Sequence, residues 1–314
     1  MSTSAEPQRL SGRVTAGVEL GGTKTIAVIG CGADILARVQ FPTTTPSETL
    51  GRVAAQLRIW HNSHKLEALG VASFGPIALN PSRAGAGHIL ATPKPGWAGT
   101  DVLGPIRAAL PVPIMLHTDV TAAALAEGRW GAAKGLSDFV YVTIGTGIGM
   151  GIVVGGRPIT GRMHPEAGHL RVRRMAGDTF PGICPFHEDC LEGLASGPAI
   201  AARTGMGADC LPEDRAEWTF IADALAEGVA TLLLTLACER IVIGGGVGIG
   251  RPHLLPLVRE RVAAKLGGYV STVDDDALHK IIVPAALGGD AGPLGALALS
   301  HLILADGLAL TPIR

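Results

Sequence analysis

The chain has 314 residues, of which 47% are hydrophobic and only 17% are charged, whereas average soluble domains have roughly 25% charged residues. Its net charge is −1 and both signs are interspersed, so it has no long-range field to attract nucleic acid or an anionic membrane surface. These numbers exclude both classes of partner and predict a globular protein with a large apolar core, about two domains in size.

The sequence also carries no sign of export or membrane insertion. Residues Met1–Arg13 are polar, and the longest apolar runs, such as 229–237, are shorter than the ~18–20 residues of a membrane span. We therefore expect a cytoplasmic protein. The cytosol would keep its five cysteines reduced, and only Cys184 and Cys190 are close enough in sequence to act together.

The first half of the chain begins with three predicted strands separated by turns. Its expected elements are strands over 14–18, 26–29 and 35–41, a helix over Glu48–Leu66 with Ser47 as its N-cap, and a buried strand over 68–73.

The same pattern returns about 120 residues later, which indicates a duplicated unit. The expected elements are a helix over 119–133 capped by Thr118 or Asp119, strands over 139–144, 152–154 and 158–160, a helix over 218–238, a strand over 240–243, a turn at 244–246 and a helix over 294–308. Strands that alternate with apolar helices favour a mainly parallel sheet covered on both faces. We therefore predict an α/β protein of two similar lobes around a cleft.

A Gly-rich turn follows the first strand of each copy, at Gly21–Lys24 and at Gly145–Gly149. Because glycine has no Cβ, its backbone N–H groups can approach a phosphate closely. A Walker loop or a Rossmann fingerprint needs a helix after the glycines, whereas strands are expected here. The turns are therefore either plain tight hairpins or, as their repetition favours, matched hairpins for a polyphosphate.

Five segments of the sequence form a set. They are Glu-Leu-Gly-Gly-Thr-Lys at 19–24, Gly-Thr-Gly-Ile-Gly at 145–149, His-Pro-Glu-Ala-Gly-His at 164–169, Cys-Pro-Phe-His-Glu-Asp-Cys-Leu-Glu-Gly at 184–193 and Gly-Gly-Gly-Val at 244–247. Together they resemble the ROK family of sugar kinases, and within it the bacterial fructokinases. The resemblance implies a duplicated, ribonuclease-H-like (actin-like) fold whose lobes close on ATP and a hexose, and a homodimer. We expect an N-terminal lobe at 14–117, completed by a helix at 292–312, and a C-terminal lobe at 118–291.

The resemblance assigns the catalytic base to Asp119. Phosphoryl transfer to a sugar needs Mg²⁺ on the phosphates and a carboxylate that takes the proton of the attacking hydroxyl. Asp119 opens a predicted helix, whose dipole favours the ionised carboxylate. The alternative is that Asp119 is only an N-cap.

The resemblance also implies two sets of binding residues. The sugar-binding set is Gly75, Glu166, His169 and Glu192. The ATP-binding set is Gly21, Gly22, Thr23, Lys24, Thr146, Gly147, Gly245 and Gly246.

His169, Cys184, His187 and Cys190 offer two imidazoles and two thiols, a set that suits a closed, structural zinc site. His164 is a competing ligand, and the resemblance favours His169. The alternative is that two unrelated cysteines lie near two histidines. Since Glu166 and Glu192 flank the set, we expect zinc to orient these acids, and its removal to raise the KM for sugar more than that for ATP.

The sequence departs from the fructokinase pattern at four positions. Asn is usual at Thr121, an acidic or polar residue at His117, glycine at Met150 and tyrosine at Ala86, whereas Glu19 agrees with the fructokinase branch. The smaller Ala86 leaves room for mannose, glucose or an N-acylated hexosamine, although phosphorylation of fructose at its 6-hydroxyl remains the first expectation. A sugar-responsive repressor or sensor is the alternative of another class, but about thirteen residues before the first strand are too few for a helix-turn-helix module.

Overall fold

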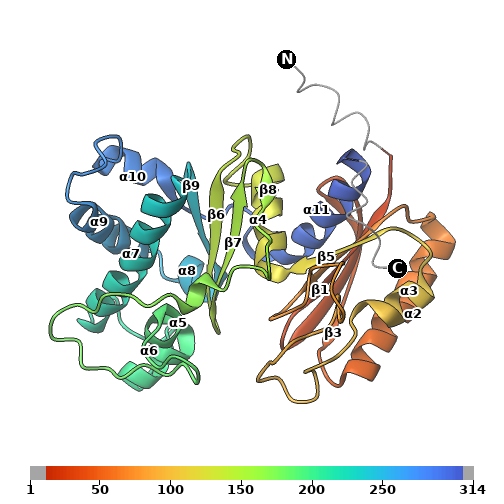
Figure 1. Ribbon diagram of the computed structural model, residues 1–314, viewed down its shortest axis with the longest axis horizontal. Helices are drawn as coiled ribbons and strands as arrows, with labels where there is room; N and C mark the ends of the chain where they lie inside the picture. Colours follow the sequence, from red (N-terminus) through yellow and green to blue (C-terminus); the bar gives the residue numbers. More distant parts are fainter. Residues whose placement is uncertain (1–11, 307–314) are drawn as a thin grey trace. The chain divides into compact units, whose positions relative to one another are not determined.

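The computed structural model describes residues 12–306, which form two compact units (Figure 1). Of these described residues, unit 1 contains 12–130, Ile159–His164 and 289–306, and unit 2 contains Gly131–Pro158 and Pro165–Gly288. The structure moves the predicted boundary at 117/118 to Trp130. The reason is packing: helix α4 (Asp119–Trp130) lies against helix α11 (Ala291–Asp306) within unit 1. The predicted end of the last helix, residue 312, lies outside the described residues.

Unit 1 is built on a five-stranded sheet with the order β3-β2-β1-β4-β5. Its strands are β1 (Thr15–Leu20), β2 (Lys24–Cys31), β3 (Asp34–Pro42), β4 (Leu69–Ser73) and β5 (Ile114–Thr118), and its other helices are α2 (Pro46–His64) and α3 (Leu103–Ala109). The first three strands form an antiparallel meander, and β4 and β5 add in parallel beside β1. The predicted meander is confirmed, whereas the predicted mainly parallel sheet is a mixed one.

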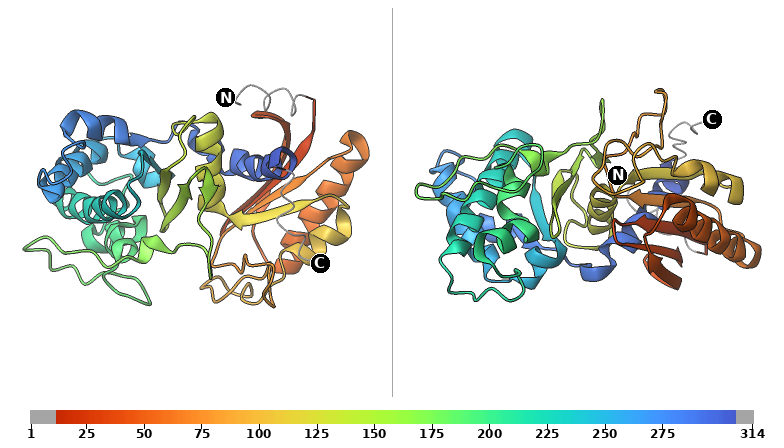
Figure 2. Two further views of the ribbon diagram at one scale, coloured as in Figure 1. Left: turned by 45° about the horizontal axis from the view of Figure 1, so that its top comes forward. Right: turned by 90° about the horizontal axis from the view of Figure 1, so that it is seen from below.

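Alternating residues of β1 serve the two faces of this sheet, as the period of two in a strand requires. Ala16, Val18 and Leu20 are buried in the apolar core that includes Leu50, Val53 and Leu57 of α2. Gly17 faces the other way, where a Cβ would lie 2.8 Å from the Cβ of Ala296 in α11. Helix α11 therefore lies close against this face of the sheet (Figure 2).

Unit 2 repeats this topology. Its sheet has the order β10-β9-β6-β7-β8, with an antiparallel meander of β6 (Phe139–Ile144), β7 (Ile148–Val154) and β8 (Arg157–Pro158), and with β9 (Arg240–Gly244) and β10 (Ile282–Pro284) in parallel. The helices are α5 (Leu191–Ala195), α6 (Gly197–Thr204), α7 (Glu217–Leu236), α8 (Gly245–Gly250), α9 (Leu254–Leu266) and α10 (Asp275–Ile281), with the short 3₁₀ turns η1 (Ala167–His169) and η2 (Gly288–Asp290). Read from its β8 edge, the sheet matches that of unit 1, so the predicted duplication is confirmed.

Several predicted boundaries are wrong for identifiable reasons. Helix α2 starts at Pro46 rather than at 48, because Thr45 caps it by accepting a hydrogen bond from Glu48 N. Strand β7 starts at Ile148 rather than at 152, because its glycines pair in the ladder like any other residue, Gly149 opposite Thr143. The predicted turn at 244–246 instead opens helix α8.

Smaller shifts affect other elements, of which three are examples. Helix α4 ends at Trp130 instead of 133, α7 spans 217–236 instead of 218–238, and β8 has only two residues.

Helix α7 is long and apolar enough, by length and composition, to cross a membrane. Half of its most apolar window is buried within the protein, and the helix packs on α9 and α5 of unit 2. The buried apolar residues of α7 therefore pack in the core of unit 2.

Candidate active site and metal centre

The first Gly-rich hairpin joins β1 to β2 in unit 1. Gly21 N donates to Lys24 O at 3.0 Å, and Gly21 O accepts from Thr43 Oγ1 at 2.8 Å, while Lys94 Nζ donates to Gly22 O. Gly22 has open space where a Cβ would lie. The predicted residues 21–24 thus form a braced turn with an accessible backbone.

Glu19 in β1 lies just before this hairpin and points toward helix α11, where a Cβ on Gly292 would overlap its carboxylate. Burial raises the pKa of Glu19, although nearby Lys24 and Arg38 act to lower it. Unit 1 therefore holds charged groups of both signs beside its glycine turn.

Asp119 is the first residue of α4 and directly follows β5. One of its oxygens, Oδ1, accepts a hydrogen bond from Val120 N at 2.8 Å. The capping bond is made by Thr118, whose Oγ1 accepts from Thr121 N at 3.3 Å. Because Thr118 caps the helix, the helix does not require Asp119 as its cap.

The two departures that flank Asp119 have structural roles. The buried Thr121 accepts a hydrogen bond from Thr118 Oγ1 at 2.8 Å. His117 Nδ1 accepts from Thr118 N at 2.9 Å, and burial, together with nearby His164, lowers the pKa of His117 to about 3. Both side chains therefore support the strand-to-helix turn that carries Asp119.

The second Gly-rich hairpin joins β6 to β7 in unit 2 and borders a cavity of about 500 Å³. The cavity is lined by Gly145, Thr146, Gly197, Pro198, Gly207, Ala208, Asp209, Gly246, Val247, Gly250 and Arg251. Small residues dominate this wall, and Asp209 and Arg251 add one charge of each sign. Such a concave space beside a glycine turn suits a nucleotide.

Of the ATP-binding residues predicted in unit 2, Thr146 and Gly246 line this cavity, whereas Gly147 and Gly245 do not. Gly245 has a φ of +82° and packs against the backbone of Ile144, so it is needed for the start of α8. Met150, the departure in this region, is a buried core residue of β7.

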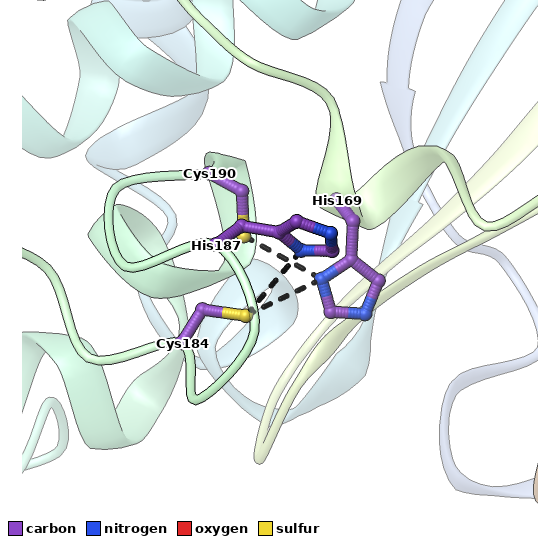
Figure 3. Close-up of side chains that lie close together, drawn as sticks. All are labelled: His169, Cys184, His187 and Cys190. Carbon is purple, nitrogen blue, oxygen red and sulfur yellow. Dashed lines mark hydrogen bonds between the residues drawn. The ribbon is translucent and has the colours of Figure 1, made fainter. Parts of the chain in front are cut away.

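Four potential metal ligands come together in unit 2 (Figure 3). One ligand atom from each of His169, Cys184, His187 and Cys190 lies within 4.8 Å of the other three. His169 Nδ1 is 3.6 Å from Cys184 Sγ and 3.5 Å from Cys190 Sγ, and His187 Nδ1 is 3.7 Å from Cys184 Sγ. A tetrahedral zinc ion with ordinary Zn–S and Zn–N bonds has edges of about 3.6 Å, so the donor set fits this metal.

Two further observations concern the choice of ligands. Without a cation, burial raises the pKa of the Cys190 thiol to about 11, and a metal would favour the thiolate instead. The competing His164 lies in unit 1, where its Nε2 accepts a hydrogen bond from Ile77 N at 3.2 Å. The cluster therefore contains His169, as predicted, and not His164.

The loop that carries the cluster is braced by a buried ion pair. Arg203 of α6 donates from Nη1 to Asp178 Oδ1 at 2.6 Å and from Nη2 to Asp178 Oδ2 at 3.1 Å. Burial acts to raise the pKa of Asp178, but these bonds and one from Phe180 N lower it. This bidentate pair fixes the long segment between η1 and α5.

The predicted sugar-binding residues are divided between the units: Gly75 lies in unit 1, and Glu166, His169 and Glu192 lie in unit 2. Glu166 is exposed, and its carbonyl accepts from His169 N at 3.0 Å. Glu192 Oε2 accepts a hydrogen bond from Ile148 N at 2.9 Å, a contact that the sequence did not predict.

Sequence reasoning also missed the far wall of the cavity. Residues 207–209 and Arg251 come from loops and helix ends with no glycine hairpin pattern, so nothing local marked them. A weak signal was available in the close glycines Gly205 and Gly207.

Known proteins resemble this chain over nearly its whole length. The chain matches the ROK family over residues 15–302. It is 40% identical to a fructokinase of Pediococcus pentosaceus over 91% of this chain and 97% of that protein. It is also 41% identical to a fructokinase of Zymomonas mobilis over 90% and 95%, respectively.

Solved structures agree with these sequence matches. A ROK hexokinase from Thermus thermophilus has a TM-score of 0.76 at 27% identity and covers 94% of this chain and 100% of its own. A ROK family glucokinase from Streptomyces griseus, solved with glucose and AMPPNP, has a TM-score of 0.70 at 23% identity over 92% of this chain and 99% of its own, and so shares the fold. The chain therefore belongs to the ROK family and has its actin-like α/β fold.

Proposed function

We propose that this protein transfers the γ-phosphoryl group of ATP to the 6-hydroxyl of fructose. The observation that carries the proposal is the identity of about two residues in five with fructokinases over at least 90% of the chain. The cavity beside the second glycine hairpin and the position of Asp119 at the start of α4 support it.

In this reaction Asp119 is the base. Its carboxylate takes the proton of the fructose 6-hydroxyl while the oxygen of that hydroxyl forms a bond to the γ-phosphorus. The bond between the γ-phosphorus and the bridging oxygen breaks, and ADP leaves with both electrons of that bond. Asp119 is suited to the role because the start of α4 favours its ionised form.

Binding is divided among the predicted residues. The sugar is held by Gly75, Glu166, His169 and Glu192. The two carboxylates can accept hydrogen bonds from its hydroxyl groups, and the imidazole can accept or donate one. The ATP is held or positioned by the cation of Lys24 and by backbone groups of Gly21, Gly22, Thr23, Thr146, Gly147, Gly245 and Gly246. Mg²⁺, bound with ATP, neutralises charge on the phosphates.

The Cys/His cluster holds a structural zinc ion. Its two thiols and two imidazoles fill four positions and leave none for a reacting water. His169 turns Nδ1 toward the cluster, which leaves Nε2 for a sugar hydroxyl. Elemental analysis of purified protein should find one zinc per chain, and a Cys184→Ser, Cys190→Ser double variant should contain none.

We also infer a cytoplasmic homodimer from the family. Light scattering on the eluting peak of a sizing column measures the mass directly, and a mass of about twice the 32.1 kDa chain is expected. A monomer would contradict this inference without affecting the proposed reaction.

The reaction is tested by measuring ADP release with fructose, mannose, glucose and N-acetylmannosamine as acceptors, each with ATP and Mg²⁺. We expect the highest kcat/KM with fructose, and phosphorus NMR should identify fructose 6-phosphate. A higher kcat/KM with another hexose would replace fructose as the substrate, and no sugar-stimulated ADP release would contradict the kinase proposal.

A further inference from the structure

Ile148, the first residue of β7, is held by two segments of unit 2 that carry metal ligands. Its N–H donates to Glu192 Oε2 at 2.9 Å, and Glu192 lies two residues after Cys190. On the other side, a Cβ on Gly168 would overlap the carbonyl oxygen of Ile148, and Gly168 directly precedes His169. Both backbone polar groups of Ile148 are therefore in contact with the neighbours of metal ligands.

The same residue directly follows the glycine hairpin at 145–147. A Cβ on Gly147 would lie 2.6 Å from Glu192 Oε2, so the carboxylate lies against the hairpin itself. The carbonyl of Gly145 accepts from Gly197 N at 2.7 Å, at the start of α6. Helices α5 and α6 thus fix the hairpin at both of its ends.

Glu192 is in turn tied to the cluster through the backbone. Ile183 N donates to Gly193 O at 3.0 Å, and Cys184 N donates to Glu188 O at 3.0 Å. A Cβ on Gly193 would overlap the carbonyl oxygen of Glu188. The helix that carries Glu192 therefore cannot shift without disturbing the loop that carries Cys184 and His187.

We propose that Glu192 is a positioning residue that connects the Cys/His cluster to the nucleotide-binding hairpin. One of its oxygens holds Ile148 N–H, and the other remains for a sugar hydroxyl. Loss of the metal then weakens ATP binding as well as sugar binding, which extends the expectation drawn from the sequence. The inference rests on the proposed function, because it takes the hairpin at 145–147 to be the ATP site.

The test compares Glu192→Ala with Glu192→Gln. The alanine variant removes the acceptor for Ile148 N–H, whereas glutamine keeps a side-chain oxygen at the same position. Glu239→Ala is the control, because Glu239 also accepts backbone N–H groups in unit 2, from Ser137 and Asp138 at the opposite end of β6. Circular dichroism verifies that each variant is folded.

Two quantities are measured on the zinc-loaded protein and after chelation. The first is hydrogen exchange of the peptide that contains Ile148, without any ligand. The second is the Kd for a non-hydrolysable ATP analogue without sugar, by calorimetry. We expect Glu192→Ala and chelation each to accelerate exchange and to raise this Kd about tenfold, as the loss of a charge-assisted hydrogen bond predicts. Glu192→Gln should raise the Kd less than about threefold, and Glu239→Ala should change neither quantity.

The inference is overturned if Glu192→Ala and chelated protein keep the wild-type exchange at Ile148 and the wild-type nucleotide Kd. An equal rise of the nucleotide Kd in Glu192→Gln and Glu192→Ala would also contradict the inference. A wild-type protein that binds no ATP analogue would instead contradict the proposed function, and the exchange at Ile148 would still test the link between cluster and hairpin.

Discussion

The glycine hairpins at 21–24 and 145–147 occupy the same place in two sheets of matching strand order, each between the first two strands of an antiparallel meander. Their supports differ. In unit 1 the turn is braced by two side chains from later in the chain, Thr43 on Gly21 O and Lys94 on Gly22 O, and Glu19 and Lys24 lie beside it. In unit 2 the turn is held by the backbone of Gly197 and by Glu192.

The two hairpins therefore share a topology but are stabilised by different contacts. The hairpin of unit 1 carries its own charges and its own brace. The hairpin of unit 2 contacts a segment that carries the Cys/His cluster and is braced by the Arg203–Asp178 pair. Each hairpin should therefore respond to a different kind of change.

The largest effect is expected for Gly168→Ala. The added Cβ would overlap the Ile148 carbonyl, and backbone cannot move aside as a flexible side chain can, so we expect a loss of about 3 kcal/mol or more in the free energy of unfolding. Chemical denaturation measures it. Gly22→Ala is the matched change in unit 1, where the space is open, and it should cost less than about 1 kcal/mol. Equal losses in the two variants would contradict the difference between the hairpins.

Acid should destabilise unit 1 through His301 of α11. Burial and nearby Arg129 lower the pKa of this buried histidine to about 4. Above pH 6.5 it is neutral in the folded and the unfolded chain; below that, the unfolded chain takes up a proton that the folded chain resists until about pH 4. The free energy of unfolding should therefore fall by up to about 3 kcal/mol between pH 6.5 and 4 from this group.

His301→Phe keeps an aromatic ring beside Trp130, which the histidine contacts edge-on at 5.5 Å between ring centroids. Denaturation followed by tryptophan fluorescence at pH 7, 5 and 4 should show a shallower loss of stability in this variant. An unchanged pH dependence would rule out the role of His301.

A smaller effect is expected for Thr43→Val in unit 1. Valine has a similar shape but cannot donate to Gly21 O or bond with Thr25 Oγ1, which lies at 2.8 Å. We expect a loss of about 1–2 kcal/mol in the free energy of unfolding and a higher KM for ATP, with no change in zinc content. A loss of zinc in Thr43→Val would contradict the independence of the two hairpin supports.

Most of this architecture could be predicted from local patterns. The two meanders and their glycine turns followed from apolar alternation, and the grouping of Cys184, His187 and Cys190 followed from their spacing, because these features depend on neighbouring residues. The choice of His169 over His164 came from the family resemblance. The start of β7 was predicted too late because glycines lie inside this strand. The glycines at 244–246 begin a helix where a turn was expected, since glycine is compatible with a turn and with a helix start.

The remaining errors arise from long-range packing. Helix α4 belongs to unit 1 because α11 returns from the end of the chain to pack on it, which no window around residue 119 can reveal. The contact of Glu192 with Ile148 spans 44 residues and gave no local signal either. The roles of the individual substrate-binding residues stay predictions.

We propose that Asp119 is the base of an ATP-dependent fructose kinase. The most direct test of this role is the turnover number of Asp119→Asn, measured as ADP release at saturating fructose and ATP, with calorimetry to verify that both substrates still bind. We predict turnover lower by about 10²–10⁴-fold with substrate affinities within a few-fold of wild type. Turnover equal to that of the wild type would contradict the role of Asp119 as the base.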